Sequence, residues 1–171
     1  MRLWTDNRRL IAIDLPNYGA SQSVDNVHSV DFYCEFLLEF LQKINFEKIH
    51  ICGLSMGGAI ALQMTLQHPN IIEKMILVAP WGITPEIPWK KFGKWLASSN
   101  INKWIYQWMK YHFVAKWAIS FSLFGDKNKI SDSLVKSVQK ASLQEKSINA
   151  FQSFQSDEIY NPKREKFFVY P

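Results

Sequence analysis

Residues 51–62, ICGLSMGGAIAL, constrain the fold of this chain more than any other stretch. A β-branched strand end runs into three glycines around one serine, Ser55, and the small residues of a helix start follow. A serine at a strand-to-helix turn takes a strained backbone conformation with positive φ. The adjacent turns then come so close that the positions two before and two after it must lack side chains. Gly53 and Gly57 meet this requirement, and Gly58 lets the helix pack tightly on a sheet.

The same turn has chemical consequences. G-x-S-x-G alone is weak evidence, since roughly one chain of this length in twenty contains it by chance. Its context here, a strand before and a helix after, is the one that exposes a serine hydroxyl. The Met56 amide then points to where an oxyanion would form, and the helix start adds positive potential. We therefore expect Ser55 to be a nucleophile and Met56 to supply one backbone oxyanion donor; the alternative is a glycine-rich turn without chemistry.

Residues 1–80 alternate short apolar runs with helical patterns, which predicts an α/β fold with a parallel sheet covered by helices. The two cysteines, Cys34 and Cys52, lie in apolar stretches and are expected to be reduced core residues. The expected strands are 10–13, 49–52 and 75–79, and the expected helices are 29–44 and 56–67.

Near residue 80 the composition changes. Residues 81–124 contain six lysines against one glutamate, and six of the seven tryptophans. Trp104, Trp108 and Tyr111 recur at three- and four-residue spacing, which predicts aromatic helices with lysines on the opposite faces. A further helix is expected at about 130–146, after a Gly-Asp break.

Such an aromatic and basic segment has several uses. It can line an apolar acyl pocket with Trp81, Trp104 and Trp108 while the lysines face water. It can dock peripherally on a membrane surface, or contact an acidic acyl carrier protein. Nucleic acid is not an expected partner, because nothing here resembles a nucleic-acid-binding module.

Three segments together resemble the α/β-hydrolase superfamily, especially its capped esterase and lipase-like members: IAIDLPNYGAS (11–21), IHICGLSMGGAIALQMTLQHP (49–69) and KMILVAPWGI (74–83). The resemblance implies a partial α/β-hydrolase fold, about strands four to six, in residues 1–80. It also implies a helical cap at 81–160, and a tail at 161–171 that begins a further core region. Asn17 stands where the family usually has glycine, a mild departure because asparagine tolerates positive φ.

The resemblance also implies parts that this sequence lacks. In the family, the second backbone amide that binds the oxyanion belongs to a His-Gly loop after strand three. Strand three itself lies between strands four and five in the sheet. The family's catalytic order is serine, then acid, then histidine. No histidine follows His112, and the four histidines are expected to be structural. Leu123–Asp126 resembles the strand–turn–Asp pattern of the acid, which makes Asp126 a weak acid candidate. The chain is thus expected to be the truncated middle of a larger hydrolase.

The expected function follows from these parts. A small-molecule carboxylic ester with an apolar part is the expected substrate, and serine acyl transfer requires no metal or organic cofactor. The alternative is a non-catalytic remnant or a lipid- or protein-binding module, because a serine without a base is a poor nucleophile. No apolar run is long enough for a signal peptide or a membrane span, so the cytoplasm is the expected location.

Overall fold

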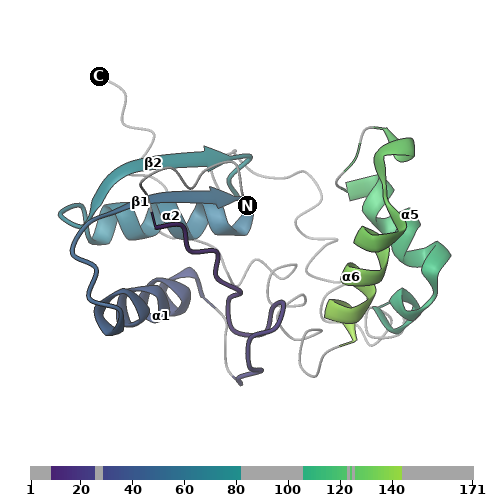
Figure 1. The fold of residues 1–171 in the computed structure, drawn as a ribbon, viewed down its shortest axis with the longest axis horizontal. Coiled ribbons are helices and arrows are strands. Elements are labelled where there is room, and N and C mark those ends of the chain that lie inside the picture. Colours follow the sequence, from purple (N-terminus) through teal and green to yellow (C-terminus); the bar gives the residue numbers. More distant parts are fainter. Residues whose placement is uncertain (1–8, 26–28, 82–105, 123, 125, 144–171) are drawn as a thin grey trace.

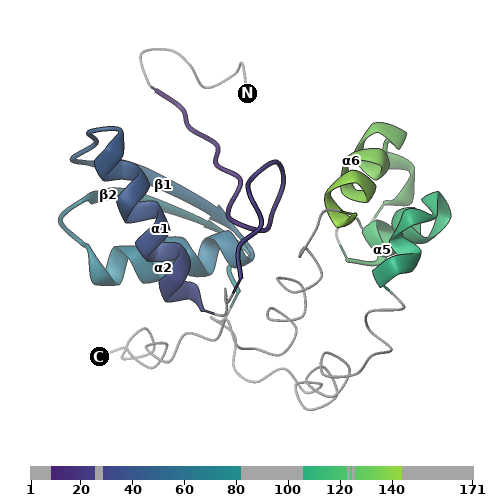
Figure 2. The ribbon, with the colours of Figure 1, turned by 90° about the horizontal axis from the view of Figure 1, so that it is seen from below.

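The computed structural model describes residues 9–25, 29–81, 106–122, 124 and 126–143. Their regular elements form two bodies (Figures 1 and 2). The first body contains α1 (Val30–Lys43), β1 (Ile49–Leu54), α2 (Met56–Gln67) and β2 (Ile72–Val78). The second body contains the short 3₁₀ helices η2 (Trp108–Lys110) and η3 (Lys127–Lys129) and the helices α5 (His112–Ser122) and α6 (Asp132–Ser142).

The two strands β1 and β2 pair in parallel, as the sequence predicts. Ile51 lies opposite Met75 and Gly53 lies opposite Leu77, so both strands end at the same edge of the sheet. The strand β2 begins three residues before its predicted start, at Ile72. Because the intervening helix α2 connects them, the three elements form one βαβ unit.

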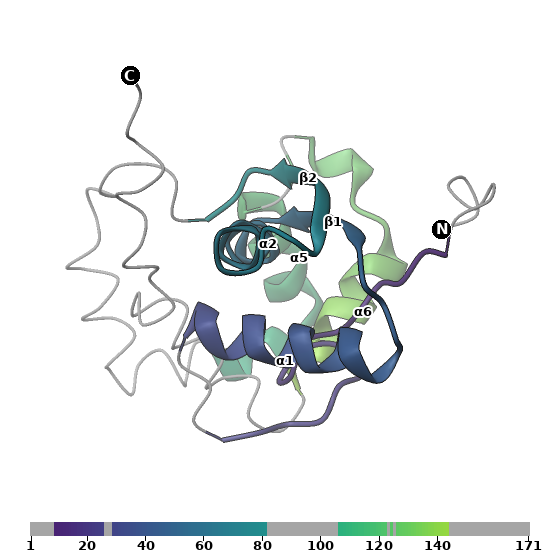
Figure 3. The ribbon, with the colours of Figure 1, turned by 90° about the vertical axis from the view of Figure 1, so that its left-hand side faces the viewer.

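Helix α2 lies between the sheet and α1 (Figures 1 and 3). A helix covered on both sides has no face for solvent, which explains why seven consecutive residues, Gly58–Met64, are buried. Gln63 is among them, and its amide donates to the Asp31 carboxylate of α1 at 2.8 Å. The core of this body is thus built around α2.

The start of α1 agrees with the prediction of a helix at 29–44. The Ser29 hydroxyl accepts a hydrogen bond from the Phe32 amide at 3.1 Å, an N-cap that satisfies one of the free amides of the first turn. Asp31 in the first turn and Lys43 in the last complement the helix dipole.

The predicted strand at residues 10–13 does not form. These residues have no regular structure, and Leu10 and Ile11 are exposed. A strand depends on hydrogen bonds from a neighbouring strand, and the described part of the sheet consists of β1 and β2 alone. The apolar run therefore predicted the wrong structure here.

Only one face of the sheet is covered in the described part of the chain. Leu54, Ile76 and Val78 point away from α2 and are exposed, so the expectation of helices covering the sheet holds for one side. Cys52 lies on the same bare face and is exposed, whereas Cys34 is buried in the core. The prediction of a core position is correct for Cys34 and wrong for Cys52.

The second body is a small helical cluster. Ala115 and Ile119 of α5 pack against Ile130 and Val135, and all four are buried. The prediction of a helix after the Gly-Asp break is confirmed by α6, which begins at Asp132 after an N-cap by Ser131. Trp104 lies outside the described residues. Of the helix expected to carry Trp104, Trp108 and Tyr111, the described part contains the 3₁₀ turn η2, and Tyr111 follows it with extended backbone. In the part of the chain described, no helix is both long and apolar enough to cross a bilayer.

Candidate active site

Ser55 lies at the turn between β1 and α2, with φ 51° and ψ −115°. The predicted positive φ is therefore confirmed. The surrounding backbone holds this conformation: the Ser55 amide donates to the Val78 carbonyl at 2.9 Å, and its carbonyl accepts from the Gly58 and Trp81 amides, both at 2.9 Å. These hydrogen bonds attach the backbone of Ser55 to β2 and to the residues just after it. They hold Ser55 in a strained backbone conformation that by itself costs about 1–3 kcal/mol.

The three glycines differ in how much space surrounds them. A Cβ at Gly53 would overlap the Gly57 carbonyl and lie 2.6 Å from the Gly58 nitrogen. At Gly58 a Cβ would lie 2.7 Å from Cβ of Pro80, which confirms that this glycine allows close packing beside the sheet. Among the described residues, nothing lies within 4 Å of a Cβ at Gly57. The steric prediction thus holds for Gly53 and is wrong for Gly57.

The serine hydroxyl and the next amide have no hydrogen-bond partner among the described residues. Within the described residues, neither the Ser55 hydroxyl nor the Met56 amide makes a hydrogen bond. Met56 is the first residue of α2, and the first amides of a helix have no partner inside it. The two groups are therefore free to contact an oxygen atom of a bound molecule at the positive end of the helix.

The loop at residues 14–19 contacts this turn through Tyr18 and is tied to α1 through Tyr33. The Tyr18 hydroxyl lies 3.6 Å from the Met56 sulfur, and the Tyr33 hydroxyl donates to the Pro16 carbonyl at 3.5 Å. Burial raises the pKa of Tyr18, and the neighbouring Tyr106 raises it further. The sequence pattern gave no sign of the contact between Tyr18 and Met56, since the two are 38 residues apart.

Asn17 contributes to the loop both through its backbone conformation and through hydrogen bonds of its side chain. Its φ is 70°, which confirms that asparagine replaces glycine at a left-handed position. The residue is 3% exposed, and its side-chain amide binds the Val24 backbone twice, donating to its carbonyl at 3.0 Å and accepting from its amide at 2.8 Å. These two bonds close the loop that carries Tyr18, a function that a glycine would not supply.

Tyr33 gives a testable pH dependence. Burial, and then the neighbouring Tyr18, raises the pKa of Tyr33 above its usual value of 10.0. The unfolded chain therefore loses this proton at a lower pH than the folded chain, so the free energy of unfolding should fall as pH rises above about 10. Urea unfolding across that range should show a shallower fall for Tyr33→Phe. Tyr111→Phe, at an exposed tyrosine, should keep the wild-type slope; equal slopes in all three proteins would contradict the prediction.

The acid and base candidates do not lie beside Ser55 in any described contact. Asp126 is exposed and caps η3, its carboxylate accepting from the Asn128 amide at 3.0 Å. The helix α5 ends at Ser122, and Leu123 and Gly125 of the predicted strand–turn–Asp pattern lie outside the described residues. As a catalytic acid, Asp126 stays an untested prediction.

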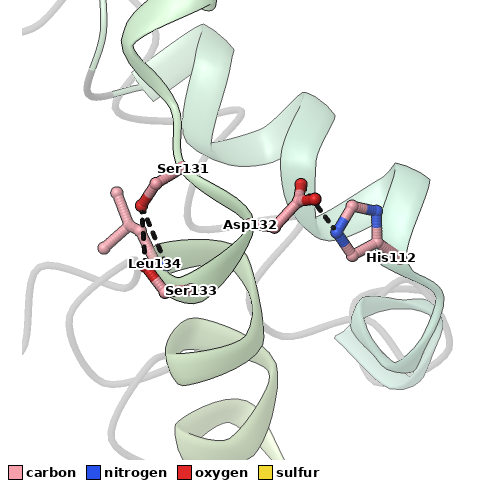
Figure 4. A network of polar contacts seen from close by, with 5 residues as sticks. All are labelled: His112, Ser131, Asp132, Ser133 and Leu134. Atoms are coloured by element: carbon pink, nitrogen blue, oxygen red, sulfur yellow. Dashed lines mark hydrogen bonds and ion pairs between the residues drawn. The ribbon is translucent and has the colours of Figure 1, made fainter.

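The described histidines have other partners. The His112 imidazole Nε2 lies 3.5 Å from Asp132 (Figure 4), and the His50 Nε2 lies 3.7 Å from Glu73. In Figure 4, Asp132 lies between the imidazole and the hydroxyls of Ser131 and Ser133, which are 2.9 Å apart. The remaining described histidine follows α2 as its C-cap, and His28 lies outside the described residues.

The predicted pocket tryptophans lie in different surroundings. Trp81 packs against the core of the first body and donates its amide to Ser55. Trp108 lies on η2 in the second body with its side chain exposed. A shared acyl pocket for these residues stays a prediction. The described residues include no cluster of three or more potential metal ligands.

Comparison with known proteins identifies the class to which this fold and this turn belong. A family model described as alpha/beta hydrolase fold matches residues 5–168, and the chain therefore belongs to the α/β-hydrolase family. The match extends to residue 168, well beyond the segments whose motifs carry the resemblance in sequence.

Individual relatives are similar over parts of the chain. A 2-hydroxy-6-oxo-6-(2'-aminophenyl)hexa-2,4-dienoic acid hydrolase of Metapseudomonas resinovorans is 31% identical over 80 residues, which cover 46% of this chain and 28% of that protein. A monoacylglycerol lipase of Xenopus laevis is 31% identical over 80 residues, covering 45% of this chain and 24% of the lipase. An esterase of Exiguobacterium antarcticum superposes with a TM-score of 0.66 at 19% identity, covering 86% of this chain and 55% of the esterase. The chain thus spans about a quarter of these sequence relatives and about half of that structure.

Proposed function

We propose that this chain carries the nucleophile of a serine hydrolase, with Ser55 as the attacking residue. The observation that carries the proposal is the turn itself: Ser55 has φ 51° at a strand-to-helix junction, with its hydroxyl unengaged among the described residues. The Met56 amide lies at the start of the helix, where it can donate to a developing oxyanion. This combination is the strained serine turn from which α/β hydrolases attack a carbonyl carbon.

The proposed substrate is a small-molecule carboxylic ester with an apolar acyl or alcohol part. The similar proteins include an esterase and a monoacylglycerol lipase, both of which their names describe as acting on esters. Acyl transfer from an ester to a serine requires a nucleophile, a base and an oxyanion site, and no metal or organic cofactor. The proposal assigns the first and part of the last to this chain.

A non-catalytic binding role is the second candidate, and a specific observation favours it. In the described part of the chain, the Ser55 hydroxyl has no hydrogen bond to a histidine, and the His112 and His50 imidazoles contact Asp132 and Glu73. A serine hydroxyl without a base reacts slowly, since loss of a triad member costs orders of magnitude in rate. In this case the turn would be retained without turnover.

Two assays on the purified chain separate these candidates. The first is hydrolysis of a short-chain p-nitrophenyl ester, and the second is covalent labelling by an alkyl fluorophosphonate, in which the serine oxygen displaces fluoride from phosphorus. We expect both signals in the wild type and a loss of at least about a hundredfold in Ser55→Ala. Ser120→Ala is the matched control and should behave as the wild type, because the Ser120 hydroxyl donates to the Trp117 carbonyl of its own helix.

The outcomes discriminate clearly. Equal hydrolysis and equal labelling in the wild type and in Ser55→Ala would refute Ser55 as the nucleophile. An intact chain that neither hydrolyses the ester nor labels at Ser55, with a circular dichroism spectrum of a folded α/β protein, would support the binding role instead.

A further inference from the structure

Helix α5 has two apolar faces, and only one of them is buried. Ala115 and Ile119 pack into the second body. Three large aromatic residues are left outside: Phe113 is 72% exposed, Trp117 64% and Phe121 82%. We call Phe113, Trp117 and Phe121 the aromatic stripe.

The stripe is continuous and points directly away from the packed face. Its members are four residues apart, so each is offset by about 40° from the last, and the stripe runs about 12 Å along the helix. At about 100° per residue, its midline lies about 180° around the helix from the buried Ala115 and Ile119. The Trp117 and Phe121 rings stack with centroids 5.8 Å apart and planes at 13°. The stripe is thus a preformed ridge of aromatic surface.

The charge of the second body is predominantly positive. Residues 106–122 contain Lys110 and Lys116 and no acidic residue. Over residues 106–143 there are six lysines, two aspartates and no arginine, and all six lysines are exposed. The exposed lysines are Lys110, Lys116, Lys127, Lys129, Lys136 and Lys140.

We propose that the aromatic stripe docks the second body on an anionic lipid surface. A helix that projects Trp and Phe on one side among lysines inserts its rings at headgroup level, while the lysines bind the anionic headgroups. A ridge of this shape suits a deformable surface. The alternative, an acidic protein partner, is less well matched, because protein interfaces are enriched in arginine and depleted in lysine. This proposal is independent of the chemistry at Ser55.

The test is sedimentation of the full chain with phosphatidylcholine vesicles that contain or lack phosphatidylglycerol. We expect binding to the anionic vesicles to be at least about tenfold stronger and to weaken as salt is added. The double variant Trp117→Ser/Phe121→Ser should lose about tenfold or more of this binding, because it removes two of the three inserted rings. Lys110→Gln/Lys116→Gln should bind the anionic vesicles more weakly, while its binding to neutral vesicles stays at the wild-type level.

Leu143→Ser is the matched control, since Leu143 is 61% exposed at the end of α6 and lies outside the stripe. It should bind as the wild type does. All substituted positions are exposed, so each variant should keep the circular dichroism spectrum of the parent. Wild-type binding by the stripe variant, or equal binding to neutral and anionic vesicles, would overturn the proposal. Absence of vesicle binding together with capture by an acyl carrier protein would overturn it in favour of an acidic protein partner.

Discussion

Gly53→Ala is expected to lower the free energy of unfolding by about 3 kcal/mol, because the added methyl group meets backbone instead of a movable side chain. Its Cβ would overlap the Gly57 carbonyl and lie 2.6 Å from the Gly58 nitrogen. Relief requires α2 to move away from β1, and α2 is held by the Ser55 carbonyl through the Gly58 amide. Urea denaturation followed by circular dichroism would measure the loss.

Gly57→Ala is the matched control for this prediction. It introduces the same methyl group four residues later, with nothing among the described residues within 4 Å of it. Alanine is also about 1 kcal/mol better than glycine inside a helix, so this variant should be as stable as the wild type or more so. Equal losses in both variants would mean that the turn requires glycine for its backbone freedom and not for close approach.

Asn17→Ala is expected to cost about 3 kcal/mol of stability. Two hydrogen bonds to the Val24 backbone are lost at about 1 kcal/mol each, and alanine at φ 70° adds about 1 kcal/mol more. Since the residue is almost fully buried, water does not readily replace the lost partners. Thermal and urea unfolding of the variant would give the change.

Two controls separate the contributions. Asn45 also has a positive φ, 56°, but it is exposed, so Asn45→Ala should show only the backbone cost of about 1 kcal/mol. Asn17→Gly removes the hydrogen bonds without strain and should cost about 2 kcal/mol. If Asn17→Ala were no worse than Asn45→Ala, the two bonds to Val24 would contribute nothing.

The sequence predicted the parts of the fold that depend on neighbours close along the chain. The turn at Ser55, the helices α1 and α2 and the parallel pairing of β1 with β2 all lie within residues 29–78. Each follows from periodicity, caps or glycine positions, which are local properties. The positive φ values of Ser55 and Asn17 were predictable for the same reason.

The errors arise where an outcome depends on distant partners. An apolar run at residues 10–13 indicates burial, but a strand also needs a neighbour to pair with, and the described chain offers none there. Cys52 lies in an apolar strand but on the face of the sheet that no described helix covers. The composition of a strand does not say which of its faces is covered. The contact of Tyr18 with Met56 and the pairing of His112 with Asp132 are long-range in the same sense.

The burial of α2 on both sides limits how this helix can change in evolution. Most helices of soluble proteins accept polar substitutions along one side, so their tolerated positions recur every three or four residues. The seven consecutive buried residues of α2 leave no such side. Natural variation in this segment should therefore be confined to exchanges of similar volume and polarity, which keeps the residues after Ser55 nearly constant while the exposed surfaces of α5 and α6 diverge.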